Sequence, residues 1–304
     1  MNNYIIAMII IFVLIILLLI AAIPDYTYTE TVQKYHYPVQ NTASKVPKLI
    51  HRTWFSNTMS NAMYKTAYLP WIKLNPSHTM IWYNDKDVEL YMKNYGKREY
   101  RAFKKLICSA YKIDLFRLLI LYEYGGVYAD SYTVPSVSID EMISRSGLNE
   151  QDIFISILDC EFVVTDGIHN GFMITTPKHP FIKQAIEDVL SNIEYGKEEK
   201  SMSMTGPIAL SKSIHKCLNH QIPHQIGLNN HQYKYYLFQF PFGLYQHIYD
   251  KNKIMFRKKM DLLYCLWYQK FYKILTRDKT NYAYANAIGK VCYTDEELNN
   301  LYNL

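Results

Sequence analysis

Short apolar runs alternate with longer amphipathic segments over most of this 304-residue chain. An apolar run bounded by turn residues predicts a strand, and apolar residues at three- and four-residue steps predict a helix. The expected strands are 48–54, 78–83, 127–129, 153–158 and 170–175, with a strand or loop at 160–165. The expected helices are 60–74, 86–95, 109 to the Gly125–Gly126 pair, 138–145, 179–193 and 208–217. This alternation predicts an α/β fold with a mostly parallel sheet and helices on both faces.

Residues 4–23 form an unbroken apolar run. As a helix, 20 residues span about 30 Å, the thickness of a bilayer core. No Lys or Arg precedes the run, and it is longer than the apolar part of a cleaved signal, although Ala21 and Ala22 leave cleavage open. We therefore expect residues 1–23 to be an N-terminal transmembrane signal anchor and residues 24–46 to be a stem. The charge pattern weakly favours a cytoplasmic amino terminus.

The globular domain is expected over 47–250, followed by a C-terminal extension over 251–304. Within 251–279, apolar residues recur at helical steps among basic ones, which predicts a basic amphipathic helix. Such a helix either packs on the domain or lies on an anionic membrane surface.

Composition narrows the function classes. Hydrophobic residues make up 49% of the chain, enough for a folded core. A formal net charge of +6 without a recognisable nucleic-acid-binding module argues against a nucleic-acid partner. Five scattered cysteines without a C-x-x-C pair do not make a disulfide scaffold.

The stretch 109–135 carries the candidate chemistry. Asp114 and Arg117 are three residues apart, so they share one face of an otherwise apolar helix. Asp130 follows the strand 127–129, at the end where open α/β sheets bind ligands. These side chains either hold a polar ligand, or they are a surface ion pair and a turn aspartate.

Five segments in this order resemble DXD-type sugar transferases with a glycosyltransferase-A fold: PKLIHRTW, LPWIKLNPSHTMIWYNDKD, YKIDLFRLLILYEYGGVYAD, HNGFMITTPKHPF and TGP. The likeness is to the yeast-type initiating α-1,6-mannosyltransferases, the mannosyl-inositol-phosphoceramide synthases and the α-1,4-galactosyltransferases. It runs from about Pro47 to Ser213. It implies a single Rossmann-like glycosyltransferase-A domain that transfers a hexose, with retention, from a nucleotide-diphosphate sugar to a hydroxyl of a glycan, glycolipid or protein.

The resemblance also implies roles for individual residues. Asp114, Arg117 and Asp130 match catalytic positions, and Asp130 is the first aspartate of the DXD motif and the candidate metal ligand. The donor-binding set is Trp54, Asp85, Asp114, Arg117 and Tyr128. Asn170 and Gly171 match the acceptor side. For Trp54, the sequence leaves base stacking and burial in the core open.

One residue departs from the family pattern. The second aspartate of the motif is replaced by Tyr132, whereas the usual pair holds a divalent cation, most often Mn²⁺. Three explanations are open: Asp130 binds the metal alone with water and diphosphate oxygens, a carboxylate such as Asp166 completes the site, or the protein is metal-independent or inactive.

The resemblance favours a membrane-anchored enzyme in a secretory, Golgi-like lumen or at a viral or cell surface. The alternative is a sugar- or nucleotide-sugar-binding membrane protein without catalysis, motivated by Tyr132. A third hypothesis is a structural membrane protein that uses its basic helix.

Overall fold

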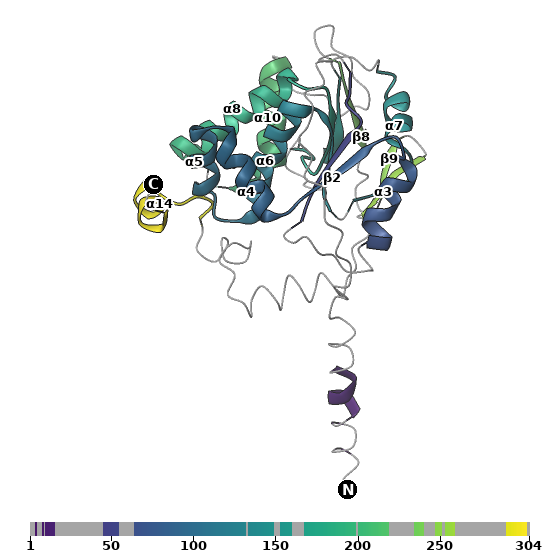
Figure 1. Ribbon diagram of the computed structural model, residues 1–304, viewed down its shortest axis with the longest axis horizontal. Coiled ribbons are helices and arrows are strands. Elements are labelled where there is room, and N and C mark those ends of the chain that lie inside the picture. The colour runs from purple at the N-terminus through teal and green to yellow at the C-terminus, as the bar shows by residue number, and fades with distance from the viewer. Residues whose placement is uncertain are drawn as a thin grey trace.

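A computed structural model describes most of the globular part of the chain and short pieces outside it (Figure 1). The described residues are 4, 8, 10–15, 45–54, 64–131, 133–148, 153–159, 167–198, 200–218, 234–239, 247–250, 253–258 and 290–302.

The described strands join in one ten-stranded sheet of order β2-β1-β3-β7-β5-β8-β9-β10-β4, with β6 beside β5. Their bounds are β1 Leu49–Thr53, β2 Thr79–Tyr83, β3 Gly126–Ala129, β4 Thr133–Pro135, β5 Ile153–Asp159, β6 Gly167–Ile168, β7 Phe172–Thr175, β8 Lys234–Gln239, β9 His247–Asp250 and β10 Lys253–Lys258. The helical elements are the π-helical turn η1 Tyr64–Tyr68, α3 Leu69–Leu74, α4 Asp85–Tyr95, α5 Lys97–Lys105, α6 Ser109–Tyr124, α7 Ile139–Ser146, α8 Pro180–Tyr195, α9 Ser201–Met204, α10 Pro207–Leu218 and α14 Asp295–Tyr302.

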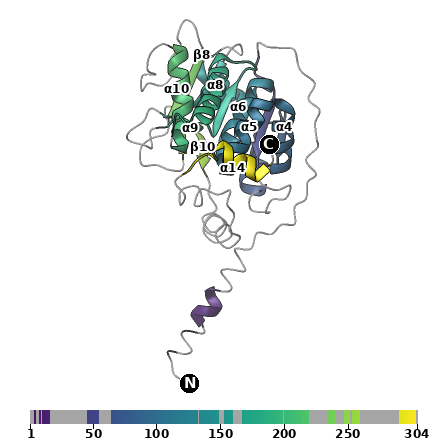
Figure 2. The same cartoon turned by 90° about the vertical axis from the view of Figure 1, so that its left-hand side faces the viewer.

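Helices cover both faces of the sheet, as expected from the sequence (Figure 1). Helices α4, α5, α6, α8 and α10 form one layer, and α3 and α7 lie on the opposite side. Two buried apolar clusters match these layers, one centred on α6 and α8 and the other containing Trp71 of α3 with Ile139 and Met142 of α7. Figure 2 shows α14 lying across the first layer.

The prediction of a mostly parallel sheet is wrong. Three of the described strand pairs are parallel, β1 with β2, β1 with β3, and β5 with β8, whereas six are antiparallel. Only residues 160–166 separate β5 from β6, which pairs antiparallel with β5, and β7 continues in the same direction between β3 and β5. A parallel neighbour needs a crossover of about a dozen residues or more, so this short return enforces the reversal.

The expected helix over 251–279 also needs correction. Residues 253–258 form strand β10, which pairs antiparallel with β9 and with β4. The apolar run Ile254–Met255–Phe256 suits a strand as well as a helix, and pairing with two neighbouring strands decides the outcome. Residues 259–289 lie outside the described part of the chain. The C-terminal segment that is described ends in helix α14.

The expected membrane anchor falls largely outside the described residues. Ile10–Ile15 are helical, and their apolar side chains are exposed. Among the residues that the structure describes, no helix is long and apolar enough to cross a bilayer. The stem, residues 24–46, lies outside them apart from 45 and 46.

Capping residues set the helix ends around the site. Asn84, rather than Asp85, caps α4: its side chain accepts from the backbone N–H of Asp87, whose carboxylate accepts from the N–H of Asn84. Helix α6 begins after Cys108, which makes no side-chain cap bond, and Ser109 is the first residue of the helix. Gly125 ends α6 at φ +63° and sends the chain directly into β3.

We expect Gly125→Ala to destabilise the fold far more than Gly196→Ala at the end of α8. Both glycines have a positive φ, of 63° and 60°, so alanine strains the backbone at both positions. At Gly125 a Cβ would also lie 2.6 Å from the nitrogen of Pro177, whereas at Gly196 no atom lies within 4 Å. The overlap adds about 1–3 kcal/mol to the loss. Urea unfolding of the two variants measures the difference, and equal losses would contradict the packing role of Gly125.

Candidate functional site

Asp114 and Arg117 lie on the buried face of α6, not on the surface. The two residues are 8% and 6% exposed. Helix α6 is the central helix of its layer, and most of its side chains from Tyr111 to Leu121 are buried. The alternative of a surface ion pair is therefore excluded for these two residues.

The guanidinium of Arg117 joins two carboxylates. Its Nη1 lies 3.3 Å from Oδ1 of Asp114, and its Nη2 lies 3.2 Å from Oδ1 of Asp130. The ring of Tyr128 lies against the same guanidinium, with Cζ 4.7 Å from the ring centroid. The helix pair and the strand-end aspartate thus form one cluster, as the sequence predicts.

Both carboxylate oxygens of Asp114 accept hydrogen bonds from neighbouring segments. Asn170 Nδ2 donates to its Oδ1 at 2.9 Å, and Thr205 Oγ1 donates to its Oδ2 at 2.9 Å. Burial raises the pKa of Asp114 to about 6, partly opposed by Arg117 and by the hydrogen bonds from Thr205 and Asn170. This carboxylate is therefore positioned by the protein on all sides.

Asp130 faces outward, with 43% of its side chain exposed. Its backbone N–H donates to the carbonyl of Gly171 at 2.8 Å, and its own carbonyl accepts from the N–H of Thr133 at 2.9 Å. A Cβ on Gly171 would overlap the carboxylate of Asp130, so only glycine permits this approach. Asp130 is the exposed member of the cluster and the one placed to meet a ligand.

The segment His169–Asn170–Gly171 contributes to the cluster at each position. His169 Nδ1 accepts from the N–H of Gly171 at 3.0 Å, Asn170 bonds Asp114, and Gly171 receives the N–H of Asp130. The structure therefore brings Asn170 and Gly171, assigned from the sequence to the acceptor side, into contact with both aspartates.

Other predicted site residues are placed differently. Tyr128 is fully buried and shares a 2.9 Å hydrogen bond between its hydroxyl and that of Thr53, so it packs behind Arg117. Trp54 is 8% exposed, which is typical of a core tryptophan. Asp85 is exposed in the first turn of α4. The donor-binding roles of these residues stay predictions, and Tyr132 and Asp166 lie outside the described residues.

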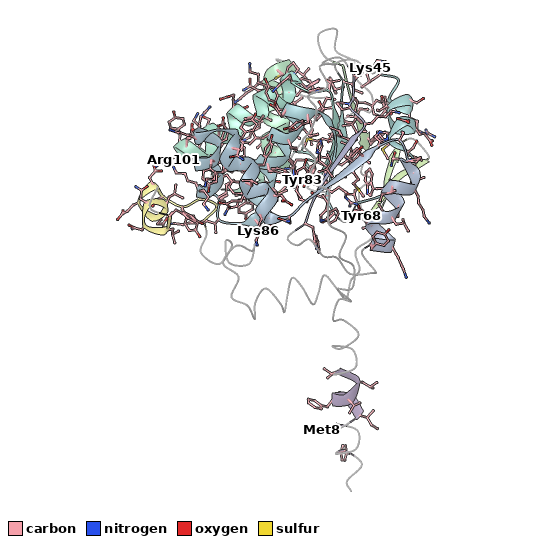
Figure 3. All side chains as sticks on the ribbon, in the orientation of Figure 1. Met8, Lys45, Tyr68, Tyr83, Lys86 and Arg101 are labelled. Carbon is pink, nitrogen blue, oxygen red and sulfur yellow. The ribbon has the colours of Figure 1, made fainter. Side chains whose placement is uncertain are left out.

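Sequence reasoning missed two buried polar side chains on β1. His51 binds the hydroxyl of Tyr83 through Nδ1 and the carbonyl of Gly125 through Nε2, both at 3.0 Å. Tyr83 is the last residue of β2 (Figure 3) and packs in the apolar cluster on the α6 side of the sheet. Burial lowers the pKa of His51 to about 4, so the neutral ring donates to the end of α6. Arg52 is fully buried beside it. The sequence did contain a signal: two adjacent basic residues lie inside a predicted core strand. Because buried charges require partners, both side chains could have been expected to bind polar groups of other segments.

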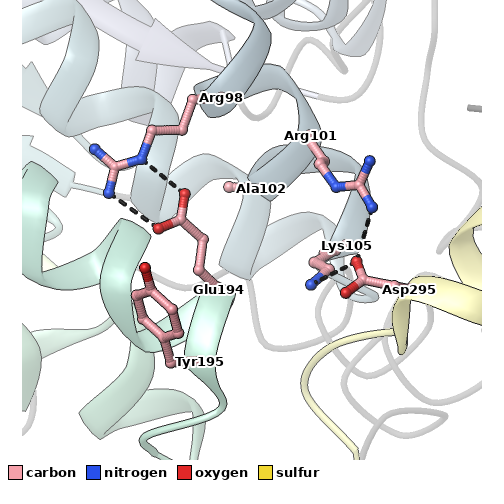
Figure 4. A pocket seen from close by; sticks show the side chains of 7 residues that line it. All are labelled: Arg98, Arg101, Ala102, Lys105, Glu194, Tyr195 and Asp295. Carbon is pink, nitrogen blue, oxygen red and sulfur yellow. Dashed lines mark hydrogen bonds and ion pairs between the residues drawn. The ribbon is translucent and has the colours of Figure 1, made fainter.

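A separate pocket of about 500 Å³ lies where α5, α8 and α14 meet (Figure 4). Its cations are paired: Arg98 with Glu194 at 2.7 Å, and Lys105 and Arg101 with Asp295 at 2.8 and 3.0 Å. No lining residue belongs to the Asp114–Arg117–Asp130 cluster. These pairs connect α5 to α8 and to α14, so we assign the pocket a structural role.

Residues 18–148 match the family model described as "Glycosyltransferase sugar-binding region containing DXD motif". The matched range contains Asp114, Arg117 and Asp130. Over this region, which is less than half of the chain, the sequence is similar to the DXD glycosyltransferase family.

The chain is also similar in sequence to yeast mannosyltransferases. The chain is 27% identical over 184 residues to "Inositol phosphoceramide mannosyltransferase 1" of Schizosaccharomyces pombe, covering 57% of this chain and 53% of the relative. It is 29% identical over 132 residues to "Initiation-specific alpha-1,6-mannosyltransferase" of Candida albicans, covering 41% and 34%. The chain therefore spans about half or less of the length of these mannosyltransferases.

A solved structure, "PaToxG Glycosyltransferase", overlaps 58% of this chain and 71% of its own, with a TM-score of 0.42 and 17% identity. A TM-score this low does not establish a common fold.

The buried state of Asp114 predicts a pH dependence of stability. Its folded pKa of about 6 lies above the ordinary value of 3.8, so the folded state holds the proton more tightly. Between about pH 4 and pH 6, the free energy of unfolding should therefore fall as pH rises, by up to about 3 kcal/mol. Urea unfolding of wild type and Asp114→Asn over this range isolates the effect. Parallel curves would contradict it.

Proposed function

We propose that this protein is a hexosyltransferase that uses a nucleotide-diphosphate sugar and a hydroxyl acceptor, within a single glycosyltransferase-A domain. The observation that carries the proposal is the position of Asp130: an exposed carboxylate at a strand end, held by a buried arginine, inside the region matched by the sugar-binding family. The mannosyltransferase relatives favour mannose as the transferred sugar and a glycan or glycolipid acceptor.

In the proposed reaction, the acceptor oxygen bonds to the anomeric carbon while the bond from that carbon to the diphosphate breaks. The electron pair leaves on the diphosphate, and the proton of the acceptor hydroxyl is released. We propose retention of configuration, so no carboxylate is needed as a covalent nucleophile.

We propose a different role for each residue of the cluster. Arg117 is buried and engaged with two carboxylates, so we propose that it fixes Asp130 instead of reaching the diphosphate. Asp114 orients Arg117, and Tyr128 supports the guanidinium from behind. Asn170 and Gly171 fix the two aspartates from the side that we propose faces the acceptor.

Asp130 presents the exposed negative charge of the cluster, whereas the guanidiniums of Arg117 and Arg52 are buried behind it. A donor diphosphate brought to Asp130 would be repelled unless a cation lay between them. Among the described residues, no three His, Cys, Asp or Glu side chains gather as a metal site. Asp130 nevertheless fits a hard cation as one carboxylate ligand, with diphosphate and water oxygens supplying the rest. A divalent cation, which we propose to be Mn²⁺, would neutralise the leaving diphosphate.

We further propose that residues 4–23 anchor the enzyme in a membrane as a single-pass, type II protein. The exposed apolar side chains of Ile10–Ile15 and the apolar character of the whole run support this proposal. The catalytic domain would then lie in a secretory lumen or at a surface.

The second candidate is a nucleotide-sugar-binding protein without catalysis, and the specific observation in its favour is Tyr132. Measuring donor binding together with nucleotide release, using GDP-mannose and UDP-sugars with and without Mn²⁺, separates the two. Binding without turnover would establish the second candidate and overturn the first.

We expect Asp130→Asn to lower turnover at least 100-fold, because the amide removes the exposed charge and weakens the contact with Arg117. Asp140→Asn is the matched control, since Asp140 is exposed in the first turn of α7. Nucleotide release by both variants is the measurement. Wild-type turnover in Asp130→Asn would show that the site is misassigned.

We expect Tyr132→Asp to lower the Mn²⁺ concentration needed for half-maximal turnover by about 10-fold. A second carboxylate adds an oxygen ligand of the kind that hard cations prefer. Titrating Mn²⁺ against nucleotide release in both proteins measures the shift. An unchanged or higher requirement would argue that the cation, if used, binds elsewhere.

A further inference from the structure

Arg52 is a buried cation whose bonds go to backbone carbonyls. It lies on β1 with 0% exposure, and no carboxylate among the described residues forms an ion pair with it. Three of its hydrogen bonds reach carbonyls at the junction of β3 and β4, which we call the 129–133 loop: Nη2 donates to Asp130 at 2.8 Å and to Thr133 at 3.3 Å, and Nε donates to Ala129 at 3.4 Å. Nη1 donates to the carbonyl of Ala67 at 2.6 Å.

Aromatic rings complete the environment of this guanidinium. Its Cζ lies 5.4 Å from the ring centroid of Trp71 and 5.7 Å from that of Trp82. Trp71 also binds the loop directly, through a 2.7 Å bond from its Nε1 to the carbonyl of Thr133. The rings exclude water from the guanidinium and leave the carbonyls as its hydrogen-bond acceptors.

A charge in this position is costly unless its donors are satisfied. Burial lowers the pKa of Arg52 to about 9, partly opposed by the nearby Tyr128 and Asp130, and the group remains protonated at neutral pH. An apolar side chain would fill the same space without this cost. Unlike an apolar side chain, the planar guanidinium donates to several carbonyls at once and so fixes the positions of these carbonyls relative to one another.

Asp130 is consequently held through three of its own groups. Arg52 and Thr133 bind its carbonyl, Gly171 accepts from its N–H, and Arg117 binds its carboxylate. The contact from Arg117 sets where one carboxylate oxygen lies. The other contacts set the path of the backbone that delivers the carboxylate.

We propose that Arg52 is a positioning residue for Asp130: by clamping the carbonyls of the 129–133 loop, it holds the carboxylate in the geometry that the donor and its cation require. The inference rests on the proposed function for its catalytic consequence, whereas the clamping of the loop is testable without turnover.

The first measurement is hydrogen exchange in Arg52→Lys. Lysine keeps the charge but cannot donate to four carbonyls in a planar fork. The amide of Asp130, bonded to the carbonyl of Gly171, and that of Thr133, bonded to the carbonyl of Asp130, should exchange at least 10-fold faster, while the amides of β5 keep their wild-type rates. Arg145→Lys, on the surface of α7 with Glu141 as its partner, is the matched control and should change neither set.

The second measurement is a double-mutant cycle on nucleotide release. Arg52→Lys alone should lower kcat about 10-fold with a smaller effect on the donor KM, and it should add no further loss in the Asp130→Asn background. If the two losses multiply, Arg52 acts on the fold generally and the proposal is overturned. If wild type shows no turnover, the proposed function fails, and the exchange rates alone decide whether Arg52 clamps the loop.

Thr133→Val provides a second variant if Arg52→Lys does not fold. It removes the hydroxyl that also donates to the carbonyl of Asp130 and leaves the guanidinium in place. Faster exchange at Asp130, with a loss of kcat that disappears in the Asp130→Asn background, supports clamping of this carbonyl. Unchanged exchange in every variant that folds overturns the proposal.

Discussion

The ion pairs of Arg117 are the interaction on which the site depends. One guanidinium holds Asp114, on the same helix, and Asp130, beyond the end of the following strand. These contacts lie on the buried side of the cluster, where water screens them little. Removing Arg117 would leave Asp114 as a buried carboxylate without its cation, so the pair of acids requires the base between them.

The sheet supports this cluster from behind through strand β1. His51 fixes the carbonyl of Gly125, where α6 ends, and Arg52 fixes the carbonyl of Asp130, where β3 ends. Successive residues of a strand face opposite sides of the sheet, so the two side chains reach different layers. Strand β1 thus positions both ends of β3, the four-residue strand that separates the helix pair from the exposed aspartate.

Charge balance connects the architecture with the proposed chemistry. The exposed carboxylate of Asp130 is negative and so is a donor diphosphate, so the two repel each other unless a cation lies between them. Under the proposed function, a cation with few protein ligands meets this requirement, because phosphate oxygens can complete its coordination. Under this proposal, Tyr132 removes one carboxylate ligand from the cation site, and Asp130 remains as its protein ligand.

The sequence by itself determined the local elements and the central cluster. The spacing of Asp114 and Arg117, the glycine pair and the strand-end Asp130 are short-range features, and local geometry decides them. Tertiary structure alone decided that β7 runs antiparallel, that residues 253–258 are a strand, and that Arg52 binds the loop of Asp130. Each of these depends on partners far away in the chain: Arg257 of β10 pairs with Val134 of β4, 123 residues earlier, and Arg52 lies 78 residues before Asp130. Hydrophobic periodicity carries no information about such partners, because it records which side of an element is buried and not what buries it.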